Sequence, residues 1–483
     1  MSSPSDSTVL GVVLLIRHGD RQGFYQDPNT YDASATAITP LGNVRPLSFS
    51  GRAQRTHRLS CMARTYQQQE VQLGGLLRSL YFDPSSSSHI RNTDLGLFNV
   101  SQVQIRADAG DEGGVIYDSA VSLTQGLWPP STAYNTTLAN GTTITGPMGG
   151  YQYIPIESVE SSNDVSLEGF TSCGTFNNAT TAFYASPEFK QKTEESQAFL
   201  SELPPYLDGR PATLQNMWNI FDYMNVNSIH NANFSKTLPP TFLAQARDLA
   251  NWHEYNTFTS PQLSGIENIA GRTVLPSMIT GIQRIANASD PLSFVLEAIS
   301  YKPFLSLFNM TGAAEENSGL ANIVEYAAAW ALEVRQPASG GEPVLRFNFK
   351  NGTTDTFHTY NFLNSNGDVP VSTFLNTLAP PAVNTTAQWC SVCSNTKDRG
   401  CGLLAAASAQ GAQNAASEHH QRISPVGAGF LGAGLTVAVF LMAFAALVSL
   451  GVLTFGNGRS RRASKAGEKG MKGIDHGSVD SHA

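Results

Sequence analysis

The chain has 483 residues, enough for one large domain or two with an extensive core. Only 14% of its residues are charged, and the formal net charge of −8 and pI near 5.7 argue against a nucleic-acid partner. The apolar and glycine content is that of a globular protein and not of a disordered one.

The first predicted element is a buried strand that ends in a charged cluster. Residues 12–16 are all β-branched or aliphatic, and the sequence Arg-His-Gly-Asp-Arg follows at residues 17–21. Such a short apolar run is typical of a strand in a parallel sheet, where ligands bind beyond the carboxyl ends. Arg17 and Arg21 offer planar donors for phosphate or carboxylate, and His18 between them can act as nucleophile or proton carrier. A solvated charge cluster at a strand end is the alternative interpretation.

Residues 17–21 resemble the signature of the histidine phosphatase superfamily, in particular its histidine acid phosphatase branch in a membrane-anchored, fungal-type form. The resemblance implies an α/β fold, a three-layer phosphoglycerate mutase-like sandwich with an inserted helical cap. It also implies that His18 attacks phosphorus and forms a phosphohistidine, while Arg17 and Arg21 neutralise the phosphoryl oxygens. The family usually has a proline two residues after the second arginine, where this chain has Gly23.

Two parts of that family's site are not found in the sequence. A second strand is predicted over residues 103–108 and a helix over 119–127, and in the family the loop between them supplies a third phosphate-binding arginine. Here residues 110–115 contain two carboxylates and no arginine. A later strand, residues 294–300, is followed by Tyr301 and Lys302 where the family has a His-Asp pair, whose aspartate donates a proton to the leaving alcohol.

Other residues are candidates to replace the missing groups. Arg106 is a candidate for the anion site, and Lys302 is a candidate source of positive charge. The candidate proton donors are Glu112, Glu297, Glu315 and Glu316. Without replacements, loss of a general acid and of an electrostatic donor together lowers the rate about 10⁴–10⁷-fold. The sequence therefore predicts a phosphate cradle with weak or degenerate turnover.

Residues 1–150 and 282–380 are predicted to form the α/β domain, and residues 151–281 the helical cap that shapes substrate choice in the family. The cap contains His230 and His253. Each either faces the pocket or is an ordinary packed or surface histidine, and the second interpretation is the commoner one.

Residues 45–68 interrupt the predicted α/β domain. They contain five arginines without a clear period and separate a helix-start signal at residues 39–42 from a predicted helix at 70–80. We interpret this segment as a disordered insertion or an unspliced intron, and a genuine basic loop is the alternative. Its presence in the mature transcript would exclude the intron.

A cysteine-containing stalk is predicted over residues 381–425. In a lumenal protein, its cysteines Cys390, Cys393 and Cys401 predict disulfides, with Cys173 as a candidate partner. A Cys-X-X-Cys zinc or redox site is the alternative, but no second pair or suitably spaced histidine completes it. Neither a metal nor a cofactor is expected.

Residues 426–455 are predicted to cross a membrane. The segment is nearly all apolar and free of charged residues, and about 20 such residues suffice to span a bilayer. Basic residues follow in the tail, 456–483, so the positive-inside rule places the tail in the cytosol and the large domain in the lumen or outside the cell. Nine glycosylation sequons agree with this topology, although roughly five are expected by chance, and no signal peptide is evident.

Three functions fit these observations. The first is a membrane-anchored phosphatase that hydrolyses small phosphorylated molecules with weak activity. The second is a pseudophosphatase that binds phosphorylated ligands without turnover, and the third is a structural or adhesive surface glycoprotein. The lipid bilayer is a predicted partner in all three.

Overall fold

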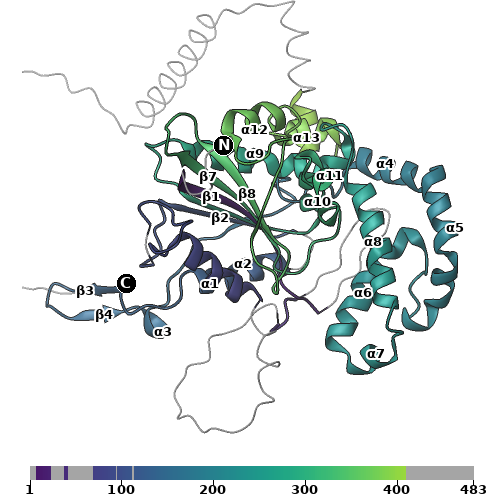
Figure 1. Ribbon diagram of the computed structural model, residues 1–483, viewed down its shortest axis with the longest axis horizontal. Coiled ribbons are helices and arrows are strands. Elements are labelled where there is room, and N and C mark those ends of the chain that lie inside the picture. Colours follow the sequence, from purple (N-terminus) through teal and green to yellow (C-terminus); the bar gives the residue numbers. More distant parts are fainter. Residues whose placement is uncertain (1–6, 23–36, 42–68, 94, 111–113, 409–483) are drawn as a thin grey trace, which may run out of the picture. The chain divides into compact units, whose positions relative to one another are not determined.

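The computed structural model describes residues 7–22, 37–41, 69–93, 95–110 and 114–408. Its centre is an eight-stranded mixed sheet with the order β10-β8-β7-β1-β6-β2-β5, and β9 pairs with β8 (Figure 1). The strands of this sheet are β1 (Ser7–Arg17), β2 (Val103–Asp108), β5 (Glu157–Val159), β6 (Phe294–Ile299), β7 (Ala329–Pro337), β8 (Val344–Lys350), β9 (His358–Tyr360) and β10 (Val369–Pro370). A separate hairpin consists of β3 (Asn135–Thr137) and β4 (Thr143–Thr145).

Strand β1 lies in the middle of the sheet and buries both of its faces. It runs parallel to β6 and antiparallel to β7. Because side chains alternate along a strand, Val12, Leu14 and Ile16 belong to one hydrophobic core, and Val13 and Leu15 belong to a second core on the opposite face. This two-sided burial explains the continuous apolar run in the sequence.

Helices cover both faces, which gives the three layers (Figure 1). Helices α1 (Gln69–Tyr81) and α2 (Val115–Leu127) pack on one face and contact each other closely. Gly74 is required at that crossing, since a Cβ there would lie 2.1 Å from the carbonyl oxygen of Leu123. The opposite face carries α9 (Ile269–Ala286), α10 (Lys302–Met310) and α12 (Val371–Leu378).

A group of helices lies beside the sandwich and forms the cap (Figure 1). The helices of the cap are α4 (Gly174–Tyr184), α5 (Pro187–Glu202), α6 (Met217–His230), α7 (Ala232–Thr237) and α8 (Phe242–Phe258). The short elements are α3 (Pro147–Gly150), α11 (Ala313–Glu316), α13 (Thr386–Val392) and the 3₁₀ turns η1 (Pro204–Tyr206), η2 (Leu214–Asn216), η3 (Ile266–Asn268) and η4 (Ser318–Leu320). The α/β fold expected from the resemblance is therefore confirmed.

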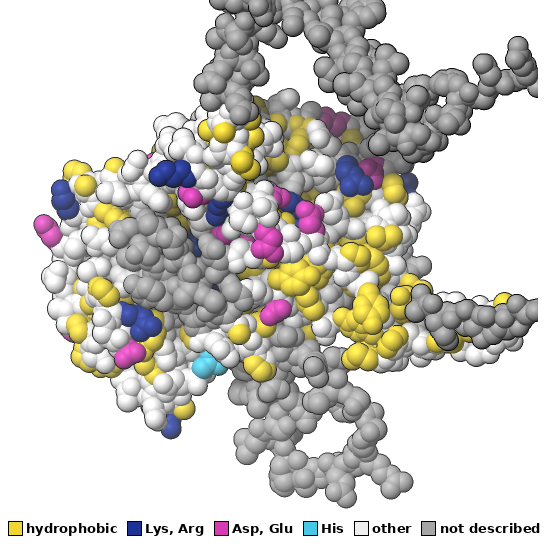
Figure 2. All heavy atoms as spheres, turned by 180° about the vertical axis from the view of Figure 1, so that it is seen from behind, with side chains coloured by type: hydrophobic (Ala, Val, Ile, Leu, Met, Phe, Trp, Pro, Cys, Tyr) yellow, Lys and Arg dark blue, Asp and Glu magenta, His cyan; other side chains and the backbone are white. Residues whose placement is uncertain are grey.

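The surface has few charges, as the composition indicates. Figure 2 shows the face behind the view of Figure 1, where the Lys and Arg side chains of the described residues are scattered and several lie beside Asp or Glu side chains. No basic patch gathers on this face among the residues that are coloured there.

The predicted stalk does not begin at residue 381. Two disulfides, Cys173–Cys393 and Cys390–Cys401, fasten this region, so the prediction of disulfides involving Cys173 is confirmed. Trp389 is fully buried, and its indole Nε1–H donates to the carbonyl of Gly169 at 2.8 Å. Residues up to Ser408 thus belong to the same compact unit as the sandwich, because the disulfides and this tryptophan hold them against it.

Several predictions fall on residues outside the described ranges. They concern the insertion at 45–68, the membrane segment at 426–455 and the tail at 456–483. Within the described ranges, none of the helices combines the length and apolar composition needed to cross a bilayer. The membrane anchor and the lumenal placement of the large domain stay predictions.

The two disulfides should differ in their contribution to stability. The Cys173–Cys393 bond closes a loop with a sequence separation of 220, against 11 for Cys390–Cys401. Since loop-closure entropy grows with loop length, we expect removal of the first bond by paired Cys→Ser substitutions to lower the free energy of unfolding by about 5 kcal/mol, against about 3 kcal/mol for the second. Denaturant unfolding measures both, and a larger loss for the short loop would contradict the assignment.

Candidate functional site

The charged cluster follows β1 at the edge where the parallel strands end. Its backbone is held by neighbouring elements: the Gly19 N–H donates to Ser119 Oγ at 3.0 Å, and the Asp20 N–H donates to Gln69 Oε1 at 2.9 Å. Strand β6 pairs with β1 up to Ile299. The residues after β6, where the family has its acid, therefore lie at the same edge of the sheet as the cluster.

His18 is held as a neutral imidazole with a defined tautomer. It is 1% exposed, and its Nδ1 lies 2.8 Å from the carbonyl oxygen of Gly19. Because a carbonyl only accepts, Nδ1 carries the hydrogen and Nε2 carries the lone pair. Burial, followed by the positive charges of Arg17 and Arg21, lowers the pKa of His18 well below its usual value. The arrangement is that of a nucleophile.

Arg17 is buried between two aromatic rings. Its Cζ lies 4.5 Å from the ring centre of Tyr326 and 5.2 Å from that of Tyr301, and its Nη1 donates to the carbonyl of Val324. Its Nε–H is buried and has no hydrogen-bond partner among the residues that the structure describes. A buried guanidinium donor in this state is suited to an anionic ligand.

Arg21 is paired with a carboxylate of the cap. Its Nη1 lies 2.8 Å from Oδ2 of Asp222 on α6, and both side chains are mostly buried. A small pocket between sandwich and cap is lined by Arg17, Arg21, Trp218, Phe221, Asp222, Tyr301 and Ile323. It holds little more than a water-sized group in this arrangement. Asp222 therefore stands at the arginines where an incoming anion would bind.

Asp20 connects the cluster to the cap. Its carboxylate accepts hydrogen bonds from the hydroxyl of Thr39 and from His230 on α6, whose Nε2 lies 2.7 Å from Oδ2. Burial raises the pKa of Asp20, and the bonds from Thr39 and His230 act in the opposite direction. The contacts fit a positioning role for Asp20. His230 bonds to the cluster and is not an ordinary surface histidine.

Tyr301 and Lys302, which the sequence analysis placed where the family has its acid, are engaged in other contacts. The Tyr301 hydroxyl donates to Oε2 of Glu254 at 2.6 Å, and Oε1 of Glu254 accepts from His253 Nδ1 at 2.8 Å. The other ring nitrogen of His253 bonds to the hydroxyl of Tyr184 at 2.9 Å. Burial, followed by the negative charge of Glu254, raises the pKa of Tyr301 well above its usual value, so this phenol is a poor acid.

Lys302 is 1% exposed and its ammonium lies among aromatic rings. Its Nζ is 4.8 Å from the ring centre of Phe170 and 5.9 Å from that of Trp218, within the range of cation–π attraction. These aromatic rings stabilise the buried ammonium, which explains how a lysine can occupy this position beneath the cap.

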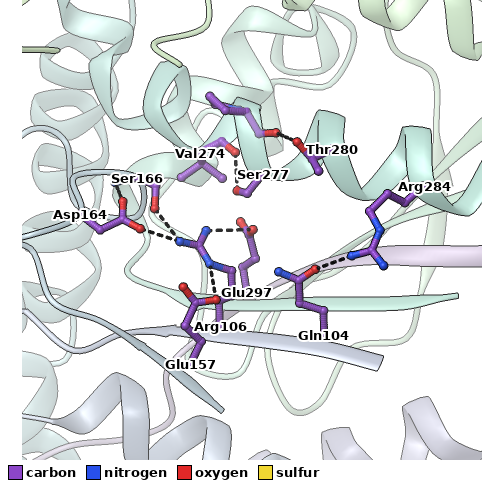
Figure 3. Close-up of polar contacts among 11 residues, drawn as sticks. Gln104, Arg106, Glu157, Asp164, Ser166, Val274, Ser277, Thr280, Arg284 and Glu297 are labelled. Atoms are coloured by element: carbon purple, nitrogen blue, oxygen red, sulfur yellow. Dashed lines mark hydrogen bonds and ion pairs between the residues drawn. The ribbon is translucent and has the colours of Figure 1, made fainter. Parts of the chain in front are cut away.

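Arg106 lies in a separate cluster of charges (Figure 3). Its guanidinium contacts Glu157 at 3.1 Å, Asp164 at 2.7 Å and Glu297 at 3.7 Å. Arg106 and Glu297 face each other across the β2–β6 pair. Because three carboxylates already neutralise it, Arg106 is not placed to bind a phosphate, and the structure does not support the role that we considered for it.

The suggested proton donors are also elsewhere. Glu297 belongs to the Arg106 cluster, Glu315 and Glu316 are exposed on α11, and Glu112 lies outside the described residues. The polar residues that do line or flank the pocket, Asp222, Glu254 and Tyr326, were not predicted. No local sequence signal marks them, because Asp222 and Tyr326 contact the arginines of the cluster, and Glu254 contacts Tyr301, from distant parts of the chain.

Comparison with known proteins agrees with this geometry. The sequence matches the profile described as "Histidine phosphatase superfamily (branch 2)" over residues 8–347. The chain belongs to this family. No curated protein sequence matches the chain significantly.

Three solved structures show what the chain is similar to. A phytase from Hafnia alvei in complex with tartrate has 12% identity and a TM-score of 0.49, covering 79% of this chain and 98% of that chain. The phytase of Klebsiella sp ASR1 has 14% identity and a TM-score of 0.49, with 80% and 98% covered. The phytase from D. castellii has 12% identity and a TM-score of 0.47, with 82% and 83% covered.

The zinc alternative for the cysteines is not supported. Cys390 and Cys393 are each bonded to another cysteine and are not available as thiolate ligands. Among the described residues of this family member, no group of three or more His, Cys, Asp or Glu side chains is arranged to hold a metal ion.

The Arg21–Asp222 pair leads to a prediction about ligand affinity. Because Asp222 competes with an anion for Arg21, we expect Asp222→Asn to tighten vanadate or phosphate binding about tenfold. Titration calorimetry measures the affinity. Asp290→Asn is the matched control, since Asp290 pairs with Arg284 at the same 2.8 Å but away from the pocket. Weaker binding by Asp222→Asn would show instead that Asp222 positions Arg21 for the ligand.

The Arg106 cluster predicts a pH-dependent stability. Burial raises the pKa of Glu297 from 4.5 to about 7, against the effects of the Ser277 hydroxyl and of Arg106. Because the folded protein binds the Glu297 proton more tightly than the unfolded chain does, the protonated carboxyl stabilises the fold. This contribution is fully present below the unfolded pKa, and it is lost as the pH rises through 7. We expect the free energy of unfolding to fall by up to about 3 kcal/mol between about pH 4.5 and 8 from this group.

Glu297→Gln tests this expectation, because the amide cannot titrate. Denaturant unfolding of this variant should show a flatter pH dependence than that of the wild type. Glu157→Gln is the control, since the Glu157 side chain in the same cluster is 55% exposed. Equal pH dependence in wild type and Glu297→Gln would contradict the raised pKa.

Proposed function

We propose that the protein hydrolyses phosphate monoesters through a phosphohistidine at His18, with weak activity that favours esters of good leaving groups. Family membership supports phosphomonoester hydrolysis. The observation that carries the proposal is the neutral His18, with its lone pair on Nε2, between two buried arginines. This combination provides a nucleophile and positive charge for the phosphoryl oxygens at one point.

The proposed reaction has two displacements at phosphorus. In the first, the lone pair of His18 Nε2 forms the N–P bond, the P–O ester bond breaks, and the leaving oxygen departs with the electron pair as an anion that takes its proton from solvent water. In the second, a water oxygen attacks the phosphohistidine, the N–P bond breaks, and the proton of that water is released. Arg17 and Arg21 bind the phosphoryl oxygens in both steps, and Asp222 must leave Arg21 for this to occur.

Neither of the two residues that we place where the family has its acid serves as an evident acid for the first displacement. Tyr301 donates its proton to Glu254, and Lys302 lies among aromatic rings, so neither is placed to protonate an alkoxide. A general acid typically contributes about 10²–10⁴ in rate. Esters whose leaving group departs as a stable anion avoid this loss, and we therefore expect aryl phosphates to react faster than alkyl phosphates.

Acidic conditions should favour the reaction. Burial and the charges of Arg17 and Arg21 hold the pKa of His18 well below its usual value, so this nucleophile is protonated at a more acidic pH than an ordinary histidine. The second ionisation of a phosphate monoester lies near pH 6, and below it the ester is a monoanion. A monoanion suits this pocket better than a dianion, because the Asp222 carboxylate that lines the pocket repels negative charge even after it has left Arg21.

A pseudophosphatase that binds phosphorylated ligands without turnover is the second candidate. Two points favour it: Asp222 is paired with Arg21, and the resemblance implies that Tyr301 and Lys302 stand where the family has its acid pair. The two candidates share the binding site and differ only in turnover, so one assay separates them.

We expect the purified protein to release phosphate from p-nitrophenyl phosphate, at a rate that rises from about pH 7.5 to about pH 5 because the monoanion forms near pH 6. His18→Ala should abolish this release, since no nucleophile remains. Steady-state kinetics measure both, with vanadate binding to show that each protein is folded at the site. Equal release by the two proteins would exclude the enzyme, and vanadate binding alone would favour the pseudophosphatase.

A further inference from the structure

Tyr326 lies against both reacting parts of the site. Its ring centre is 5.6 Å from that of His18 at a tilt of 46°, and 4.5 Å from Cζ of Arg17. The segment before β7 that carries it is tied to the cluster by two backbone bonds: the Ala327 N–H donates to the His18 carbonyl at 3.2 Å, and the Arg17 N–H donates to the Ala328 carbonyl at 2.9 Å. The position of Tyr326 is therefore fixed relative to the nucleophile.

The phenol of Tyr326 is buried and unused. The residue is 6% exposed, and its Oη has no hydrogen-bond partner among the residues that the structure describes. Leaving a buried hydroxyl unpaired is unfavourable, so such a group in a native structure requires an explanation. The Nε–H of the adjacent Arg17 is in the same state. Two neighbouring side chains thus each hold a buried donor and have no acceptor for it.

The phenol keeps its proton under all ordinary conditions. Burial raises the pKa of Tyr326 to about 12, and the surrounding charges of Arg21, Asp222, Arg17 and Asp20 act on it in opposite directions. Tyr326 is consequently a neutral hydrogen-bond donor and a weak acid. This distinguishes it from the groups that the family uses at the leaving oxygen.

We propose that Tyr326 is a catalytic residue whose hydroxyl donates a hydrogen bond to a non-bridging oxygen of the phosphoryl group held by Arg17 and Arg21. It would take over part of the stabilisation that the family obtains from its third arginine, for which residues 110–115 of this sequence offer no arginine. No covalent bond to Tyr326 forms or breaks, and its proton stays on Oη. The inference deepens the proposed function and rests on it.

Tyr326→Phe is the decisive variant, because it keeps the ring against His18 and Arg17 and removes only the hydroxyl. Removing one such donor typically lowers kcat about 10²–10³-fold. We expect a fall of about 100-fold with p-nitrophenyl phosphate and an equal proportional fall with glycerol phosphate, since a bond to a non-bridging oxygen does not depend on the leaving group. Vanadate affinity should also fall.

Tyr360→Phe is the matched control. Tyr360 lies on β9, and its ring packs on Phe347 and Phe349, away from the pocket. Its kcat and vanadate affinity should equal those of the wild type. Near-equal thermal unfolding midpoints for the three proteins would show that the effect of Tyr326→Phe is not a loss of folding.

Three results would overturn the inference. Unchanged kcat and vanadate affinity in Tyr326→Phe would show that the hydroxyl does not contact the phosphoryl group, and the proposed function would stand. A loss confined to glycerol phosphate would place the phenol at the leaving oxygen instead. If the wild type shows no His18-dependent release of phosphate, the proposed function fails. In that case the inference is tested by vanadate binding alone, and equal vanadate affinities of the wild type and Tyr326→Phe would overturn it.

Discussion

The structure around the site depends on the burial of three basic side chains at the end of one strand. Arg17, His18 and Arg21 are each at most 6% exposed. Removing a charge from water is strongly unfavourable unless the charge is paired, placed against π-systems or neutralised. All three solutions occur here: Arg21 pairs with Asp222, Arg17 lies between Tyr301 and Tyr326, and His18 loses its proton.

This constraint explains why the cap and the sandwich form one unit. Asp222 and His230 both come from α6, and they reach Arg21 and Asp20 across 201 and 210 residues of sequence. The same contacts that neutralise the cluster also cover it, which leaves only a small pocket. An anionic ligand can replace Asp222 as the partner of Arg21, so ligand binding and the position of the cap are physically coupled.

The sequence predicted those parts of the fold whose signal is local. The apolar run of β1 and the motif after it identified the strand, the family and the place where an anion would bind, and β2 and β6 also lie where we expected them. Strand β7 was missed, because Glu333 and Arg335 interrupt its Ala-Trp-Ala-Leu-Glu-Val-Arg sequence, whereas the apolar run of β1 is continuous. The groups opposite His18 could not be predicted, because Asp222 and Tyr326 look like ordinary helix and loop residues until the chain folds. Arg106 shows the converse: its position suggested phosphate, and only its contacts reveal that carboxylates already bind it.

The central claim is that His18 accepts a phosphoryl group. Intact-protein mass spectrometry within seconds of mixing with an aryl phosphate at mildly acidic pH tests it most directly. We predict that the wild type gains the mass of one phosphoryl group and that peptide mapping places it on His18, whereas His18→Ala gains none. The account would be contradicted if the wild type bound the ester and released phosphate at its steady-state rate while no phosphorylated protein was detected.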